Sequence, residues 1–111
     1  MYPPVTRKTI ERRKALAPAA EGAFRDFGRA VFAEGALDAK TKQLLAVAVA
    51  HITQCPYCIR AHAKAARRSG VSDEQIMEAV WVAAEMAAGA AMSHATLALD
   101  EIDTEGHDVP T

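Results

Sequence analysis

The 111-residue chain carries 13 Lys and Arg against 14 Asp and Glu, so its formal net charge is −1. A chain with this balance has no excess positive charge to attract a phosphate backbone or an anionic membrane surface. The composition therefore argues against nucleic acid as a partner. The length predicts one ordinary domain. Half of the residues are hydrophobic while aromatics make up 5%, and an apolar mass of mostly small or aliphatic residues favours closely packed helices.

The chain is expected to have no membrane-spanning segment. Glu85 interrupts the Ala-rich run over residues 80–91, and residues 1–11 lack the apolar core of a signal peptide. We therefore expect a cytoplasmic protein. In that compartment thiols are kept reduced, and a close cysteine pair is more often catalytic or metal-binding than structural.

The first part of the chain predicts an arm followed by two helices. Residues 1–17 form an N-terminal arm with one or two turns of helix. Pro18 suits the first turn of a helix, and apolar residues at three- and four-residue spacing continue this helix to Gly35, which offers a left-handed stop. Asp38 is a good N-cap for a second helix over residues 39–53.

Pro56 separates that second helix from a third. A proline has no N–H to donate and disfavours helical geometry in the preceding residue, so the helix should end near Gln54. Proline is favoured at the first position of a helix. Cys55 is therefore expected at or next to the N-cap of a helix that reaches Gly70.

The last predicted helix begins with a capping box formed by Ser72 and Gln75. Its apolar face consists mostly of alanines, over which a partner helix can approach closely, and Gly89 would bend or divide it. Residues 101–111 are expected to be a frayed tail. The predicted fold class is all-α, with five to six helices in a domain over residues 18–100 that oligomerises through helix faces, because a monomer would leave the Ala-rich surface uncovered.

Cys55 and Cys58 are the only cysteines, and their spacing predicts redox chemistry. Two cysteines three positions apart at the start of a helix lie close enough for a disulfide. The free N–H groups and the helix dipole stabilise a thiolate there, which favours Cys55 as the reactive sulfur. His62 lies one turn beyond Cys58 and can exchange a proton with it, which favours Cys58. Spacing alone leaves the attacking and the resolving sulfur unassigned.

Two other interpretations of these residues stay open. Buried cysteines and a histidine can simply fill a core. Alternatively, His51, Cys55, Cys58 and His62 would form one stripe of a continuous helix, but over about 16 Å at about 1.5 Å rise per residue, which is too long for one tetrahedral zinc. A kink at Pro56 would shorten this distance. The expectation is a site without metal or cofactor.

The runs KQLLAVAVA at residues 42–50 and CPYCIRAH at residues 55–62 resemble the carboxymuconolactone decarboxylase superfamily, specifically its alkylhydroperoxidase D-like (AhpD-like) branch. The resemblance covers most of the chain, from about residue 23 to residue 99. It implies an all-α fold assembled as trimers or hexamers, with peroxide- or disulfide-reducing activity that needs no metal or flavin. Cys55, Cys58 and His62 match the cysteine pair and the histidine of the family.

The resemblance also exposes a departure at Gln43. The family usually has a glutamate twelve residues before the first cysteine, where it completes a proton relay, and an amide cannot exchange a proton. Glu85 is a candidate substitute, because a carboxylate on an apolar helix face needs a partner, either His51 or His62 or a group across a subunit boundary. The alternative is a partly exposed glutamate beside a lysine or arginine.

The leading functional prediction is a thiol-dependent peroxidase or disulfide oxidoreductase with an antioxidant role. It would reduce small hydroperoxides and be recycled by an external dithiol or a lipoyl-type reductant. One alternative is a carboxymuconolactone-type decarboxylase, whose acid–base chemistry needs no cysteine pair. The other is a non-enzymatic redox-sensing oligomer.

Overall fold

The structure, a computed structural model, describes residues 1–105. Its elements are α1 (Arg7–Leu16), α2 (Pro18–Phe32), α3 (Ala39–Thr53), α4 (Pro56–Arg68) and α5 (Asp73–Asp103). All five are α-helices, so the all-α fold class is confirmed with the lower of the two expected helix numbers. The rest of the predicted tail, residues 106–111, lies outside the described residues.

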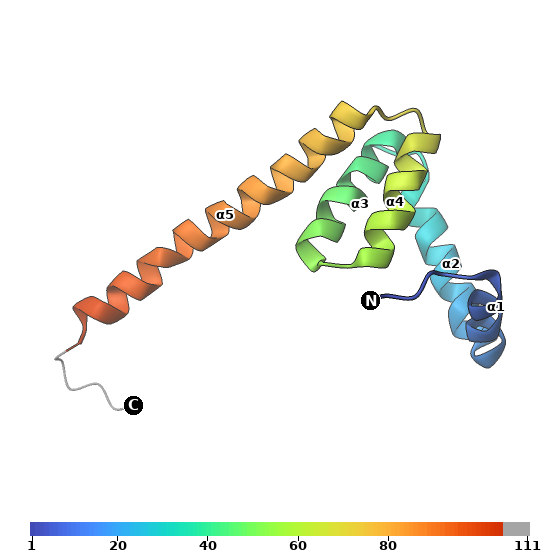
Figure 1. Cartoon of the computed structure of the whole chain (residues 1–111), viewed down its shortest axis with the longest axis horizontal. Coiled ribbons are helices and arrows are strands. Elements are labelled where there is room, and N and C mark those ends of the chain that lie inside the picture. The colour runs from blue at the N-terminus through green and yellow to red at the C-terminus, as the bar shows by residue number, and fades with distance from the viewer. Residues whose placement is uncertain (106–111) are drawn as a thin grey trace.

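α3 and α4 form a helical hairpin, and the first part of α5 packs against α3 (Figure 1). The centre of this unit is formed by Val47 of α3, Ala66 of α4 and Val71 of the following connection, all at most 3% exposed. The absence of a side chain beyond Cβ in Ala66 allows the neighbouring elements to approach it closely. This small core holds the two helices that carry the cysteine and histidine residues.

The helix starts follow the capping residues that the sequence predicts. An Asp38 carboxylate oxygen accepts a hydrogen bond from the Thr41 N–H at 2.7 Å, and Ser72 and Gln75 make both bonds of a capping box. Cys55 is the N-cap of α4, and its sulfur accepts a hydrogen bond from the Cys58 N–H. These three predictions are confirmed.

The turn between α3 and α4 depends on Gln54. This residue has φ 56° and ψ 48°, the left-handed conformation that commonly ends a helix, and its N–H donates to the Ala50 carbonyl. The chain thus reverses within residues 54 and 55, and α4 starts immediately at Pro56. This tight reversal is what brings the start of α4 beside the end of α3.

The N-terminal part differs from expectation in two ways. The arm contains the full helix α1 instead of one or two turns; α1 lies against α2, and Arg13 bonds Glu21. α2 ends at Phe32 and not at Gly35, because Ala33 is already extended. The Ala33 carbonyl accepts a hydrogen bond from Lys42 Nζ at 2.6 Å, so a side chain of α3 satisfies this group.

α5 runs without interruption through 31 residues, and Gly89 does not divide it. The helix also continues past Leu99 to Asp103, so the first residues of the expected frayed tail are helical. A single interior glycine costs only about 1 kcal/mol relative to alanine. That cost is small beside the propensity of the many alanines around it.

α5 also corrects the expectation about membrane-spanning segments. By length and composition it is long and apolar enough to cross a membrane, with a mean hydropathy of 1.2 over its best window. Glu85 alone does not offset the alanines and methionines of this window. Only 6% of the window is buried within the chain, and a helix that packs between protein subunits has the same composition.

Candidate redox site

Cys55 and Cys58 form a disulfide at the start of α4, with their Cα atoms 5.2 Å apart. This separation lies within the usual range for disulfides. The Cys58 N–H donates to Cys55 Sγ at 3.2 Å, and the first turn of α4 contains no acidic residue. A thiolate at this position would meet the N–H groups and the positive end of the helix dipole without an opposing carboxylate in that turn.

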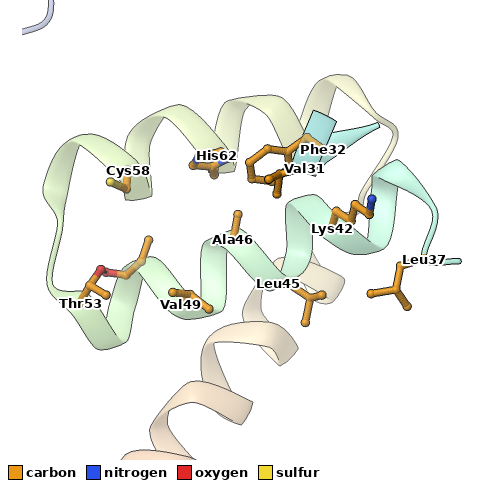
Figure 2. Close-up of a pocket in the computed structure, with 11 residues that line it drawn as sticks. Val31, Phe32, Leu37, Lys42, Leu45, Ala46, Val49, Thr53, Cys58 and His62 are labelled. Atoms are coloured by element: carbon orange, nitrogen blue, oxygen red, sulfur yellow. The ribbon is translucent and has the colours of Figure 1, made fainter. Parts of the chain in front are cut away.

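Cys58 and His62 both face a groove of about 480 Å³ between α3, α4 and the end of α2, which we call the redox groove (Figure 2). Figure 2 shows both side chains projecting from α4 toward α3. The cysteine–histidine pair predicted from helical spacing therefore shares one accessible surface. The residues lining the groove are Val31, Phe32, Leu37, Lys42, Leu45, Ala46, Val49, Ala50, Thr53, Cys58 and His62.

The His62 ring is held by two neighbours. Its Nδ1 lies 2.8 Å from Gln43 Oε1, and the Phe32 ring stacks on it with the centroids 5.1 Å apart and the planes at 25°. An amide oxygen only accepts hydrogen bonds, so Nδ1 carries the hydrogen in this contact. The lone pair of the neutral imidazole is then on Nε2, which is the nitrogen able to take a proton.

Gln43, at the position where the resemblance implies a glutamate, contacts the histidine directly. In the contact formed here, the amide oxygen of Gln43 faces Nδ1 and helps to orient the His62 ring. An amide cannot exchange the proton, so its contribution is positional.

Glu85 and His51 do not join this site within the described chain. Glu85 is exposed on α5, and no hydrogen bond or ion pair between residues 1 and 105 links it to His51 or His62. His51 Nδ1 bonds the Val47 carbonyl one turn back on its own helix at 2.7 Å. The expected pairing of Glu85 with either histidine is therefore not formed in a single subunit.

The structure does not form the helical stripe on which the zinc alternative depended. α3 ends at Thr53 and α4 starts at Pro56 in a new direction, so His51 and His62 do not lie on one continuous helix. Among residues 1–105, no group of three or more His, Cys, Asp or Glu side chains is arranged to hold a metal ion.

Sequence reasoning missed several residues that shape the groove, above all Phe32 and Lys42. Lys42, Ala46, Val49 and Thr53 follow each other at four- and three-residue spacing on α3, so their common face could have been read from the sequence. Phe32 of α2 stacks on His62 of α4, and this contact depends on how the two helices pack. A local sequence pattern therefore does not predict it.

Comparisons with known proteins agree with this architecture. Residues 18–101 match the sequence model of the Carboxymuconolactone decarboxylase family. The chain is 64% identical over 86 residues to "Uncharacterized protein 4 in cox locus" of Paracoccus denitrificans, a match that covers 75% of this chain and 78% of that protein.

Two solved structures are similar in fold and in sequence. A protein from Methanobacterium thermoautotrophicum superposes with a TM-score of 0.71 at 35% identity, covering 75% of this chain and 93% of that one. A carboxymuconolactone decarboxylase family protein from Legionella pneumophila, solved in its apo form, has a TM-score of 0.70 at 30% identity and covers 84% and 83% of the two chains. The resemblance seen in the sequence is confirmed by these matches.

Proposed function

This chain belongs to the carboxymuconolactone decarboxylase family, and from that premise we propose that it is a thiol-dependent peroxidase whose redox centre is the Cys55–Cys58 pair with His62. The observation that carries the proposal is that Cys58 and His62 line one groove while Cys55 is joined to Cys58 by the disulfide. A substrate in the groove would meet a nucleophile and a proton carrier together.

Cys58 is the attacking sulfur in this proposal, because it lines the groove and Cys55 does not. In the reduced protein, His62 Nε2 takes the proton of the Cys58 thiol. The thiolate attacks the terminal oxygen of a hydroperoxide, so that an S–O bond forms and the O–O bond breaks. His62 returns the proton to the departing alkoxide, which leaves as an alcohol, and Cys58 becomes a sulfenic acid.

Cys55 acts as the resolving sulfur. It attacks the sulfur of the Cys58 sulfenic acid, the S–S bond forms, and the hydroxyl group leaves as water with the proton of the Cys55 thiol. An external dithiol, such as a lipoyl-type reductant, then supplies two electrons and two protons and restores both thiols. The cycle needs a reducing compartment such as the cytoplasm.

The decarboxylase alternative has less support from the groove. That reaction depends on acid–base residues, and no carboxylate is found among the described residues that line the groove, where the ionisable side chains are Lys42, Cys58 and His62. A cysteine pair would have no part in such a reaction.

The experiment is steady-state consumption of cumene hydroperoxide with a dithiol supplied, comparing the wild type with Cys55→Ser, Cys58→Ser and His62→Gln. We expect both serine variants to lose turnover. His62→Gln should lose about a hundredfold, the usual scale of general acid–base catalysis. Cys55→Ser is informative because serine is a good N-cap, so α4 should keep its start and the loss reports the missing sulfur.

A matched control is His51→Gln, since the hydrogen bond of His51 among residues 1–105 is to its own helix and His51 lies outside the groove lining. This variant should retain the wild-type rate. Turnover that persists in Cys58→Ser would contradict the proposal. A wild type with no turnover of peroxides or disulfides with several dithiols would favour the redox-sensing alternative.

A further inference from the structure

The redox groove is apolar along its length but carries one fixed positive charge. Among the described residues that line it, Lys42 is the only one whose side chain is always charged near neutral pH. The other residues that line the groove have aliphatic or aromatic side chains, except for Thr53, Cys58 and His62. A groove of this composition favours a ligand that is mostly hydrocarbon.

Lys42 lies at the opposite end of the groove from Cys58. Figure 2 shows Cys58 beside Thr53 at one end and Lys42 beside Leu37 at the other, with His62 and Ala46 between them. Lys42 and Thr53 are eleven positions apart on α3, which corresponds to about 16 Å at 1.5 Å rise per residue. The part of α3 that lines the groove is therefore about as long as an extended acyl chain segment.

The ammonium of Lys42 has hydrogen-bonding capacity to spare. It donates one bond to the Ala33 carbonyl at 2.6 Å, which holds it at the end of α2. An ammonium has three donors, so two remain. None of the ion pairs formed among residues 1–105 involves Lys42, and no carboxylate lines the groove.

We infer that the preferred substrate is a hydroperoxide on a long acyl chain that ends in a carboxylate, such as a fatty acid hydroperoxide. This inference rests on the proposed peroxidase function. Lys42 binds the carboxylate, the aliphatic wall formed by Leu45 and Val49 packs against the chain, and the peroxide lies beside Cys58 and His62. The reaction is the one described above, in which the alkoxide leaves as the hydroxy acid.

Lys42 also has a structural role, because it satisfies a carbonyl at the end of α2, and the test must separate the two roles. The design compares linoleic acid hydroperoxide with its methyl ester, which has the same chain and peroxide but no charge. Both are measured with the wild type, Lys42→Arg and Lys42→Met. If Lys42 contacts the carboxylate of the substrate, replacing Lys42 raises the KM for the acid more than the KM for the ester.

With the wild type we expect a lower KM for the acid than for the ester. Lys42→Met should raise the KM for the acid at least about tenfold more than the KM for the ester, which is the scale of one charged hydrogen bond, because loss of the bond to the Ala33 carbonyl affects both substrates alike. Lys42→Arg should keep most of the preference for the acid. An equal loss on acid and ester in Lys42→Met would mean that Lys42 acts only as a cap, and would overturn the inference.

Binding of linoleic acid itself, below its micellar concentration and followed by calorimetry, tests the contact without any reaction. We expect binding to the wild type and at least about tenfold weaker binding to Lys42→Met. Wild-type turnover of cumene hydroperoxide with no preference for the acid over the ester would refute the inference alone. No turnover of any hydroperoxide would instead refute the proposed function.

Discussion

At the scale of single residues, the contact between Gln43 and His62 decides which nitrogen of the imidazole is able to accept a proton. The amide oxygen holds the hydrogen on Nδ1, and Phe32 limits rotation of the ring by stacking on its face. Gln43 and Phe32 both restrict rotation of the His62 side chain, and neither carries a charge. In the proposed reaction His62 therefore keeps a defined orientation, although Gln43 stands where the resemblance implies an acidic residue.

Gln43→Glu tests the positional role of this residue. A carboxylate beside His62 would favour the protonated imidazole, so the pH at which peroxidase activity rises on the acid side should move upward by about one unit or more. Gln43→Met, which keeps the volume but removes the acceptor, should lower kcat without this shift. The measurement is the pH–rate profile with cumene hydroperoxide, and identical profiles for the wild type and Gln43→Glu would show that the contact has no part in proton transfer.

The residues of the site divide into those that the sequence could predict and those that it could not. Cys55, Cys58 and His62 were predictable because proline geometry and helical spacing are local. The hydrogen bond between His62 and Gln43 joins two helices 19 positions apart, and the stacking of Phe32 joins a third. Contacts of that kind depend on how helices pack, so the sequence led instead to Glu85, a residue exposed on α5.

At the scale of elements, α3, α4 and α5 each start at a residue whose side chain accepts a hydrogen bond from a free backbone N–H. These starts were predictable because the capping side chain and the N–H that donates to it lie within one turn. The helix ends were less predictable. α2 stops at Phe32, before Gly35, and the carbonyl of the extended Ala33 accepts its hydrogen bond from Lys42, a residue of the next helix. Gly89 suggested a break, but one glycine does not outweigh the surrounding alanines.

Asp38 at the start of α3 gives a pH-dependent contribution to stability. Hydrogen bonds from the Thr41 side chain, and then from its backbone N–H, lower the pKa of Asp38 from its ordinary value of 3.8. A lowered pKa in the folded state means that the stabilisation is fully present above the unfolded value and is lost as the pH falls through the folded one.

Asp38→Asn isolates this effect, because asparagine is an equally good N-cap and does not titrate. Near pH 7 we expect the Tm of the wild type to equal or exceed that of Asp38→Asn. As the pH falls below 3.8, the wild type should lose stability relative to the variant. Thermal unfolding followed by circular dichroism between pH 7 and pH 3 gives the comparison. Parallel Tm curves across this range would exclude a role for the Asp38 charge.

At the scale of the whole molecule, the described chain is more extended than a compact domain of its length. Its radius of gyration is 20.0 Å, whereas a compact domain of this length has about 13 Å. α5 is about 46 Å long at 1.5 Å per residue, and most of it projects away from the α3–α4 hairpin (Figure 1). Its exposed large apolar side chains are Met77, Trp81, Val82, Met86, Met92, Leu97, Leu99 and Ile102.

We propose that second copies of the chain cover this surface of α5 in a homo-oligomer, with a trimer or hexamer as the expected size. A subunit boundary there also offers Glu85 a partner that it lacks in one chain. Leu97→Glu should raise the dissociation constant of the oligomer at least about tenfold, because it buries a charge at the interface. Leu16→Glu makes the same change at an exposed leucine of α1 and should have no such effect.

Light scattering at micromolar concentration measures the assembly, and the emission of Trp81, the single tryptophan, reports whether α5 is covered. We expect blue-shifted emission in the wild type and red-shifted emission in Leu97→Glu. A monomeric wild type with red-shifted emission would contradict the proposal. A monomer whose emission shifts to the blue only when lipid vesicles are added would indicate a membrane as the occupant of this face.

The most direct test of the central claim is a single-turnover reaction of the fully reduced protein with one equivalent of cumene hydroperoxide. Mass spectrometry then measures the Cys55–Cys58 disulfide while the alcohol product is quantified. We expect alcohol and disulfide to form together in equal amounts, and the Cys55→Ser variant to accumulate a sulfenic acid on Cys58 instead. Unreacted hydroperoxide alongside two free thiols would contradict the central claim.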